Sequence, residues 1–277
     1  MEEIDKISTE IVEAITDIEI DYYTRKLAVG TVIGKIYIYQ IISDQSKKHQ
    51  ELSVHNGPIY KLSWSNPCFG VLASGGFDKK INIIQFDNQL NGSILYNHDQ
   101  HENCITCLKF SPSSNTLLLI SGDLNGNIIS TEYSKDNNNF ITSKTFAHDF
   151  GVIAVDFLTE DKLITIGNDN RIKIWNYINT NGNIQIKNEL ELKNDNNINI
   201  KDLSCKDSTH FVICGASEGE GVANYWILND KNEWEAHEIY RNEFNLEKIR
   251  FNEEHTCIVI VDEKGKEILL KENELKL

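Results

Sequence analysis

Short runs of apolar, often β-branched residues recur along the whole chain, and short polar turns separate them. The best-formed set lies in His148–Asn176, where Val152–Phe157 and Leu163–Ile166 are mostly apolar and Arg171–Trp175 alternates polar and apolar residues. Alternation with a period of two is typical of a strand with one buried face. The connections between the runs are too short for a helix, so the pattern predicts antiparallel hairpins.

This unit recurs at a nearly constant period. When every copy is aligned on Trp175, successive equivalent positions lie 45, 47, 44, 51 and 44 residues apart. These positions are Tyr39, Ile84, Thr131, Trp175, Trp226 and Leu270. A four-stranded propeller blade takes about 40–45 residues, and so small a sheet needs stacked copies to bury its faces. We therefore expect an all-β, six-bladed β-propeller that forms a single domain over residues 1–277. The expected blades span approximately 13–54, 55–97, 101–146, 148–192, 197–239 and 244–272.

The N-terminal stretch carries two conflicting signals. Five isoleucines recur there at spacings of three and four residues, which is a helical period. They are Ile4, Ile7, Ile11, Ile15 and Ile18. β-Branched residues favour strands, however, and the repeat register places Ala14–Asp21 at the first strand of a blade. We expect a strand there, preceded by an N-terminal edge strand within residues 1–12. Three Asn-rich stretches, at 136–139, 179–183 and 194–197, predict surface loops.

Composition and charge narrow the function classes. Lys and Arg number 27 and Asp and Glu number 42, which gives a net charge of −15. Duplex binding needs clustered cations, and this chain has only isolated pairs such as Lys47-Lys48 and Lys79-Lys80. We therefore expect no nucleic-acid ligand. No window approaches about 18 apolar residues, and the acidic N-terminus does not have the pattern of a signal peptide, so we expect no membrane insertion.

Three motifs suggest a bound metal or cofactor, and each has a simpler interpretation. The Cys104 and Cys107 pair has the spacing of a zinc or redox site, but residues three apart in a strand point to opposite faces. The loop His98–Glu102 does not have the HExxH order, and Gly215–Gly221 is followed by neither Lys-Ser/Thr nor a helix. We expect no metal and no cofactor. The six scattered cysteines predict buried free thiols rather than disulfides. They are Cys68, Cys104, Cys107, Cys205, Cys214 and Cys257.

Blade four also carries what could be taken for a hydrolase triad. The residues are His148, Thr165, Asp169 and Trp175. The matching positions in blades two and three are His55, Ser74 and Asp78, and His101, Ser121 and Asn125. A catalytic triad has no reason to recur once per structural unit, so we expect no enzyme. These residues resemble the structural tetrad of WD-repeat propellers, in which hydrogen bonds tie the outer loop, inner strands and tight turn of one blade.

Blades one and two carry more specific residues. Asp17–Ala28 reads DIEIDYYTRKLA, and His55–Ile84 reads HNGPIYKLSWSNPCFGVLASGGFDKKINII. These stretches resemble the first and second blades of the Sec-thirteen family of WD-repeat propellers, with its DxxxDYYxxxLA and HxGPxWxxxW motifs. The resemblance runs over all six blades, is generic in blades three and four and is weak in blade five. This chain has shorter loops in blades four to six than is typical of the family.

The resemblance implies a non-enzymatic scaffold with an open six-bladed propeller, completed by a seventh blade from a helical-solenoid partner. In the outer COPII coat of ER-to-Golgi transport that partner is the Sec-thirty-one protein, and in the Y-shaped complex of the nuclear pore it is a solenoid nucleoporin. It also implies a cytoplasmic hetero-oligomer, peripheral on endoplasmic reticulum exit sites and COPII vesicles, or a place at the nuclear pore. Unpaired edges at the seam between blades one and six suit strand addition. The residues expected at this partner seam are Ile4, Ile7, Ile15, Ile18, Ile249 and Phe251.

Three alternatives stay open at this point. Ile4–Val12 could close the ring as the outer strand of blade six. The chain could be a Seh-type nuclear pore propeller, which is also open and six-bladed but usually has longer loops. It could also be a closed WD-repeat adaptor that binds peptides at its central face. That function needs exposed aromatic or charged loop tips, and Tyr22, Tyr23 and Phe77 lie near predicted turns.

Overall fold

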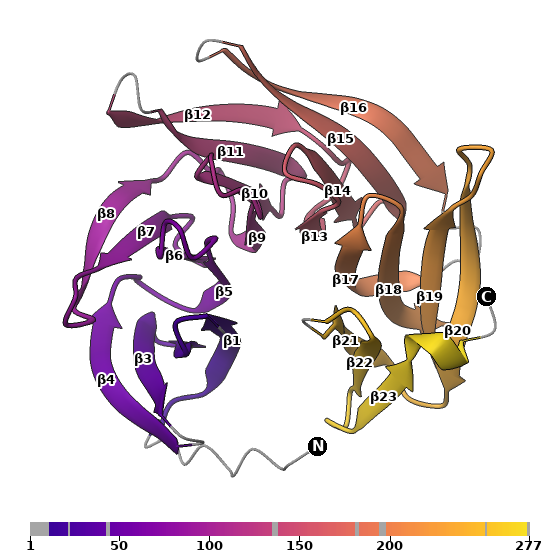
Figure 1. Cartoon of the computed structure of the whole chain (residues 1–277), viewed down its shortest axis with the longest axis horizontal. Coiled ribbons are helices and arrows are strands. Elements are labelled where there is room, and N and C mark those ends of the chain that lie inside the picture. Colours follow the sequence, from indigo (N-terminus) through magenta and orange to yellow (C-terminus); the bar gives the residue numbers. More distant parts are fainter. Residues whose placement is uncertain are drawn as a thin grey trace. The chain divides into compact units, whose positions relative to one another are not determined.

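β-Strands make up nearly all of the regular structure. The computed structural model describes residues 11–21, 23–42, 45–134, 138–180, 183–193, 198–252 and 254–275. Within them, strands form five four-stranded sheets and one three-stranded sheet, and the 3-10 turn Glu272–Glu274 is the one helical element. Each sheet is a meander of antiparallel strands that are consecutive in the sequence (Figure 1). The fold is therefore an all-β, six-bladed β-propeller, which confirms the predicted fold class.

Contacts divide the chain into two units, and the first comprises Met1–Leu124 and Ile128–Lys144. It holds the first three blades. Blade one contains β1 (Ile15–Asp21), β2 (Lys26–Thr31), β3 (Lys35–Ile42) and β4 (Gln45–Ser53). Blade two contains β5 (Ile59–Trp64), β6 (Leu72–Gly76), β7 (Ile81–Phe86) and β8 (Gly92–His98). Blade three contains β9 (Ile105–Phe110), β10 (Leu118–Asp123), β11 (Asn127–Ser134) and β12 (Asn139–Phe146).

The second unit comprises Asn125–Asn127 and Thr145–Leu277 and holds the last three blades. Blade four contains β13 (Val152–Phe157), β14 (Lys162–Gly167), β15 (Arg171–Thr180) and β16 (Asn183–Lys193). Blade five contains β17 (Asn199–Asp207), β18 (His210–Ser217), β19 (Glu220–Leu228) and β20 (Trp234–Asn242). Blade six contains β21 (Leu246–Phe251), β22 (Cys257–Asp262) and β23 (Glu267–Lys271).

A β-bulge explains the helix-like spacing of isoleucines near the N-terminus. Ile15 pairs with Thr31 and Ile18 pairs with Val29, and the register shifts between Ile15 and Asp17. Thr31 and Val29 are two apart on β2 and share a face. The extra residue in the bulge therefore brings Ile15 and Ile18, which are three apart, onto that same face. The repeat register gave the correct structure here, and the helical period did not.

The same kind of irregularity recurs in the first strand of every blade. In each, one residue is inserted near the start of the strand relative to its neighbour. The inserted residues are Thr16, Tyr60, Thr106, Ile153, Lys201 and Glu247. A bulge increases local twist and redirects the side chains that follow it. The feature is thus part of the repeated unit, although no residue type marks it in the sequence.

Apolar clusters lie between successive blades of each unit. In the first unit, Ala28, Ile36 and Ile38 of blade one pack with Ile59 and Ile84 of blade two, all fully buried. Burying one such side chain contributes about 1.5–3 kcal/mol. Similar clusters join blades two and three, blades four and five, and blades five and six. Stacking of sheets therefore supplies the core of each unit.

The surface loop predicted at residues 179–183 is wrong at both of its ends. Asn179 lies in β15 and pairs with Ile184, and Asn183 begins β16 and pairs with Thr180. This long hairpin is stabilised by continuous cross-strand pairing, which overrides the low strand propensity of Asn. In the stretch 136–139, Asn138 is in a left-handed turn conformation (φ 47°) and Asn139 begins β12. Residues 194–197 lie outside the described residues.

Candidate functional site

The polar residues of blade four meet in one buried chain of hydrogen bonds. His148 Nε2 lies 2.8 Å from Thr165 Oγ1, and His148 Nδ1 lies 2.9 Å from Asp169 Oδ1. Trp175 Nε1–H donates to Thr165 Oγ1 over 2.8 Å. Asp169 also accepts a hydrogen bond from the backbone N–H of Arg171, so these hydrogen bonds fix the tight turn between β14 and β15. The structure thus brings all four of these predicted residues together.

Blade two repeats this arrangement without the hydrogen bond that the Trp donates in blade four. His55 Nδ1 lies 2.8 Å from Asp78 Oδ1, and His55 Nε2 lies 2.8 Å from Ser74 Oγ. Ile84 occupies the position of Trp175 and offers no N–H group. The amide nitrogen of Asn82 lies 3.1 Å from His55 Nε2 and adds a contact of its own. Where Ile84 replaces the Trp, the Asn82 amide therefore provides an additional polar contact to the His55 ring.

Blade three corrects one position of the sequence alignment. His101 Nε2 lies 2.8 Å from Ser121 Oγ, as the repeat predicts. The carboxylate on His101 Nδ1 belongs to Asp123, at 2.9 Å, whereas the alignment selects Asn125. Asp123 is the last residue of β10 and is fully buried. The acid therefore comes from the end of the strand here, two positions earlier than in the turn of blade four.

Burial determines the chemistry of these groups. It lowers the pKa of His148 and of His55, although the aspartate beside each ring acts in the opposite direction. The hydroxyl-bearing residues Thr165 and Ser74 are both 0% exposed. No substrate can reach an oxygen that is fully enclosed by its own blade, so the arrangement cannot work as a hydrolytic triad. Its geometry is that of a cross-link within the blade.

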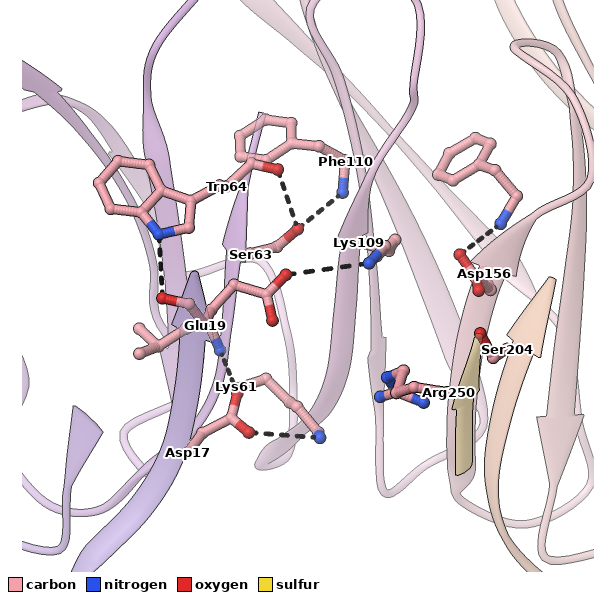
Figure 2. Close-up of polar contacts among 12 residues, drawn as sticks. Asp17, Glu19, Lys61, Ser63, Trp64, Lys109, Phe110, Asp156, Ser204 and Arg250 are labelled. Carbon is pink, nitrogen blue, oxygen red and sulfur yellow. Dashed lines mark hydrogen bonds and ion pairs between the residues drawn. The ribbon is translucent and has the colours of Figure 1, made fainter. Parts of the chain in front are cut away.

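A second set of polar contacts joins the first strands of neighbouring blades (Figure 2). In the first unit, Asp17 Oδ2 accepts the N–H of Leu62 over 2.8 Å, and Lys61 lies 3.7 Å from the same carboxylate. Ser63 Oγ accepts the N–H of Phe110 over 3.2 Å. Each bond crosses from a side chain of one blade to the backbone of the next. We did not predict these residues from the sequence.

The second unit contains the same type of contact. Asp156 Oδ2 accepts the N–H of Cys205 over 2.8 Å, and Asp202 Oδ2 accepts the N–H of Ile249 over 3.1 Å. Asp202 also pairs with Arg250, at 2.6 Å. Across both units the bonded residues lie 45 to 49 apart in the sequence. A search for Asp or Ser in a first strand, one repeat before an apolar strand residue, could have identified them.

The motifs considered for metal or redox chemistry separate in the structure. Cys107 lies within β9, and burial raises its pKa to about 12, so the thiol stays protonated. Cys104 precedes the strand, and its Sγ lies 3.5 Å from the carbonyl oxygen of Phe77. His98 bonds Thr131 instead of facing a second ligand. Among the described residues, no group of His, Cys, Asp and Glu has the geometry of a metal site, and no helix could span a membrane.

The predicted partner residues of blade one are divided between described and undescribed parts of the chain. Ile4 and Ile7 lie outside the described residues. Ile15 and Ile18 are on β1, 43% and 49% exposed. Their partners in β2 show that they share the face of blade one that turns away from blade two. Two large apolar groups therefore remain exposed on this face.

The predicted partner residues of blade six face the other way. Ile249 is fully buried in the cluster between blades five and six, and Phe251 packs against that cluster. The outward face belongs to Val259, Val261 and Leu269. Val259 and Val261 alternate along β22 with residues of the buried cluster, and Leu269 pairs with Val259. The uninterrupted apolar run of β22 is a sequence signal for a strand covered on both faces.

In the part of the chain that the structure describes, blade six has three strands and every other blade has four. Within the described residues, β23 pairs with β22 alone and is the last strand of its sheet. Leu269 on this strand is 44% exposed, and Val259 and Val261 are half-buried. An edge strand beside apolar side chains is a template for another strand. These features make the outward face of blade six the candidate functional site.

Comparison with known proteins identifies WD repeats and several similar proteins. The family described as WD domain, G-beta repeat matches residues 92–130 and 133–176. A "Protein transport protein sec13" of Emericella nidulans is 26% identical over 191 residues, 60% of this chain and 61% of that protein. A "Protein SEC13 homolog" of Drosophila melanogaster is 25% identical over 193 residues, 61% of this chain and 53% of that protein.

A third relative matches over nearly the whole chain. The "Protein transport protein sec13" of Aspergillus oryzae is 22% identical over 288 residues, which cover 93% of this chain and 95% of that protein. In the first two alignments the chain spans only about three fifths and about half of the relatives' length. Six blades, two matched WD repeats and these relatives identify the chain as a WD-repeat propeller that is similar to the Sec-thirteen proteins.

Proposed function

We propose that this protein is a non-enzymatic scaffold subunit of protein-transport machinery. Its relatives carry the name protein transport protein. Its polar tetrads are enclosed cross-links, and its repeated contacts serve to stack blades. By resemblance to the family, its place is the COPII coat of ER-to-Golgi transport, the Y-shaped complex of the nuclear pore, or both. It would act in the cytoplasm, on the surface of these assemblies.

The observation that carries this proposal is the sixth blade, which has three strands within the described residues. A sheet whose last strand, β23, has no second partner among the residues that the structure describes, and whose outward face is apolar, can bind added strands. We propose that a helical-solenoid partner, either a Sec-thirty-one-like coat protein or a solenoid nucleoporin, donates a blade that covers this face. The exposed Ile15 and Ile18 support a similar cover for blade one. The propeller is then open until its partner binds.

Affinity purification of the tagged protein, followed by mass spectrometry, tests the proposal. We expect a solenoid protein to co-purify, and its identity distinguishes coat from pore. Leu269→Lys places a charge on the outward face and should strongly reduce capture of that partner. Leu95→Lys makes the same change at a 41% exposed site on β8 of blade two and serves as the matched control.

Two outcomes contradict the proposal. In one, no solenoid protein co-purifies at any salt concentration tested. In the other, both lysine variants capture the partner as well as the wild type does, which places the binding surface elsewhere. Circular dichroism of each variant verifies that the strands are retained.

A further inference from the structure

Four large apolar side chains are exposed on the turns between second and third strands in the first unit. Val32 and Ile33 lie between β2 and β3 and are 39% and 48% exposed. Phe77, between β6 and β7, is 53% exposed, and Leu124, between β10 and β11, is 46% exposed. We call these four residues the turn patch. They lie at the opposite end of the strands from the turn that carries Tyr23.

Close contacts connect these turns in series. Gly34 (φ 85°) packs so closely on the next loop that a Cβ on it would lie 2.2 Å from the carbonyl oxygen of His55. In the same loop, a Cβ on Gly57 would lie 3.1 Å from the Phe77 ring. The backbone N–H of Leu124 donates to the carbonyl oxygen of Cys104, and the Cys104 thiol contacts the Phe77 carbonyl. The patch is therefore a continuous strip rather than three separate tips.

The charged side chains that follow Phe77 and point away from its blade are both positive. Lys79 and Lys80 lie two and three residues after Phe77, and both are exposed. Neither ammonium group forms an ion pair with any residue that the structure describes. Asp78 between them and Phe77 turns inward to His55. Glu102 is paired with Lys144 at 2.6 Å. In a chain of net charge −15, an apolar strip flanked by two unpaired lysines is a local exception.

We propose that the turn patch binds an extended peptide segment of a partner in which apolar side chains alternate with Asp or Glu. The apolar side chains would pack on Phe77 and Leu124, and the carboxylates would lie near Lys79 and Lys80. Charge complementarity favours an acidic segment over a neutral one. Two lysines are too few for stable attachment to an anionic membrane, which takes a larger basic cluster. This surface is distinct from the strand edge of blade six and does not depend on the scaffold function.

Fluorescence polarisation of a labelled peptide, in which Phe and Leu alternate with Asp and Glu, tests this proposal on the full chain. We expect saturable binding that weakens as salt increases. Phe77→Ser should weaken the affinity about tenfold, as loss of a central aromatic contact does. Its control is Tyr23→Ser, an 83% exposed aromatic at the opposite end of blade one, which should leave affinity unchanged.

The charge contribution has its own pair of variants. Replacing Lys79 and Lys80 by Glu should abolish the salt dependence and most of the binding. The same double charge reversal at Lys187, exposed on the outer strand β16 of blade four, and at Lys231, exposed between β19 and β20 of blade five, should have little effect. Three results overturn the proposal: no binding by the wild type, equal binding of a peptide with Lys in place of its acids, or co-sedimentation with phosphatidylserine vesicles that Phe77→Ser abolishes.

Discussion

Thr165 occupies the centre of the blade-four tetrad, because its hydroxyl lies between the His148 ring and the Trp175 N–H. Thr165→Val keeps the shape of the side chain but leaves both buried partners without this bond, so we expect a loss of about 1–3 kcal/mol in the free energy of unfolding. Ser74→Ala in blade two should cost less, because Ile84 there needs no hydrogen-bond acceptor. Urea denaturation of the two variants measures the difference. Equal losses would contradict this account of the tetrad.

His98 gives stability a dependence on pH. Burial lowers its pKa to about 4, and the neighbouring His101 acts in the same direction. In the unfolded chain the pKa of a histidine is about 6.5. The unfolded state therefore binds a proton that the folded state does not, and stability present above pH 6.5 is lost as the pH falls toward 4. The loss amounts to about 2 kcal/mol at pH 5.

A non-titrating side chain at this position isolates the contribution. His98→Gln retains an amide that can bond Thr131, the present partner of the ring at 3.1 Å. We expect the decrease in unfolding free energy between pH 8 and pH 5 to be smaller in this variant by about 2 kcal/mol. Chemical denaturation at both pH values provides the comparison. An unchanged pH dependence would show that His98 is not the group responsible.

At the residue scale the sequence predicts what repeats with constant chemistry. His148, Thr165 and Asp169 recur as His55, Ser74 and Asp78, so their positions could be read from the spacing. Asp123 could not, because it lies two residues before the aligned position, where the register between β9 and β10 shifts. Asp17 and Ser63 were also missed, since their partners are backbone N–H groups and only the spacing of one repeat to an apolar residue of the next first strand marks them.

At the element scale the turn between β2 and β3 depends on Gly34. Its φ of 85° is unfavourable for residues with a Cβ, and a Cβ would overlap the His55 carbonyl. We expect Gly34→Ala to cost several kcal/mol, roughly three or more, because backbone must move. Gly219 has a similar φ of 87° with nothing within 4 Å, so Gly219→Ala should cost only about 1 kcal/mol. Thermal and urea denaturation of the pair would separate strain from collision, and equal costs would argue against a collision at Gly34.

The elements themselves could be predicted from alternation and period, with two instructive exceptions. β1 has a helical spacing of isoleucines because a bulge places Ile15 and Ile18 on one face. The β15–β16 hairpin extends through Asn179 and Asn183, where composition favours a loop. In both places pairing with a neighbouring strand determines the structure, and the pattern of residues in one sequence does not show which residues pair.

At the scale of the whole molecule the number of blades followed from the period, whereas the exposed surface did not. Ile249 and Phe251 were chosen for the partner because they are apolar and lie in the first strand of the last blade. The structure places Ile249 in the cluster with blade five and leaves Val259, Val261 and Leu269 outward. Which face a strand residue occupies depends on the bulge near its start, and that bulge is invisible in the residue types.

The outward face of blade six leads to a prediction for the isolated chain. β23 is a free edge within the described residues, and Leu269 on it is 44% exposed. Such an edge pairs readily with another chain, so we expect concentration-dependent self-association in sedimentation velocity. Leu269→Lys should reduce it, because a charge on an edge strand opposes pairing. Leu95→Lys on β8 adds the same charge to a blade with four strands and should not. A wild-type protein that stays monomeric at every concentration, or two variants with equal effects, would contradict an uncovered surface on blade six.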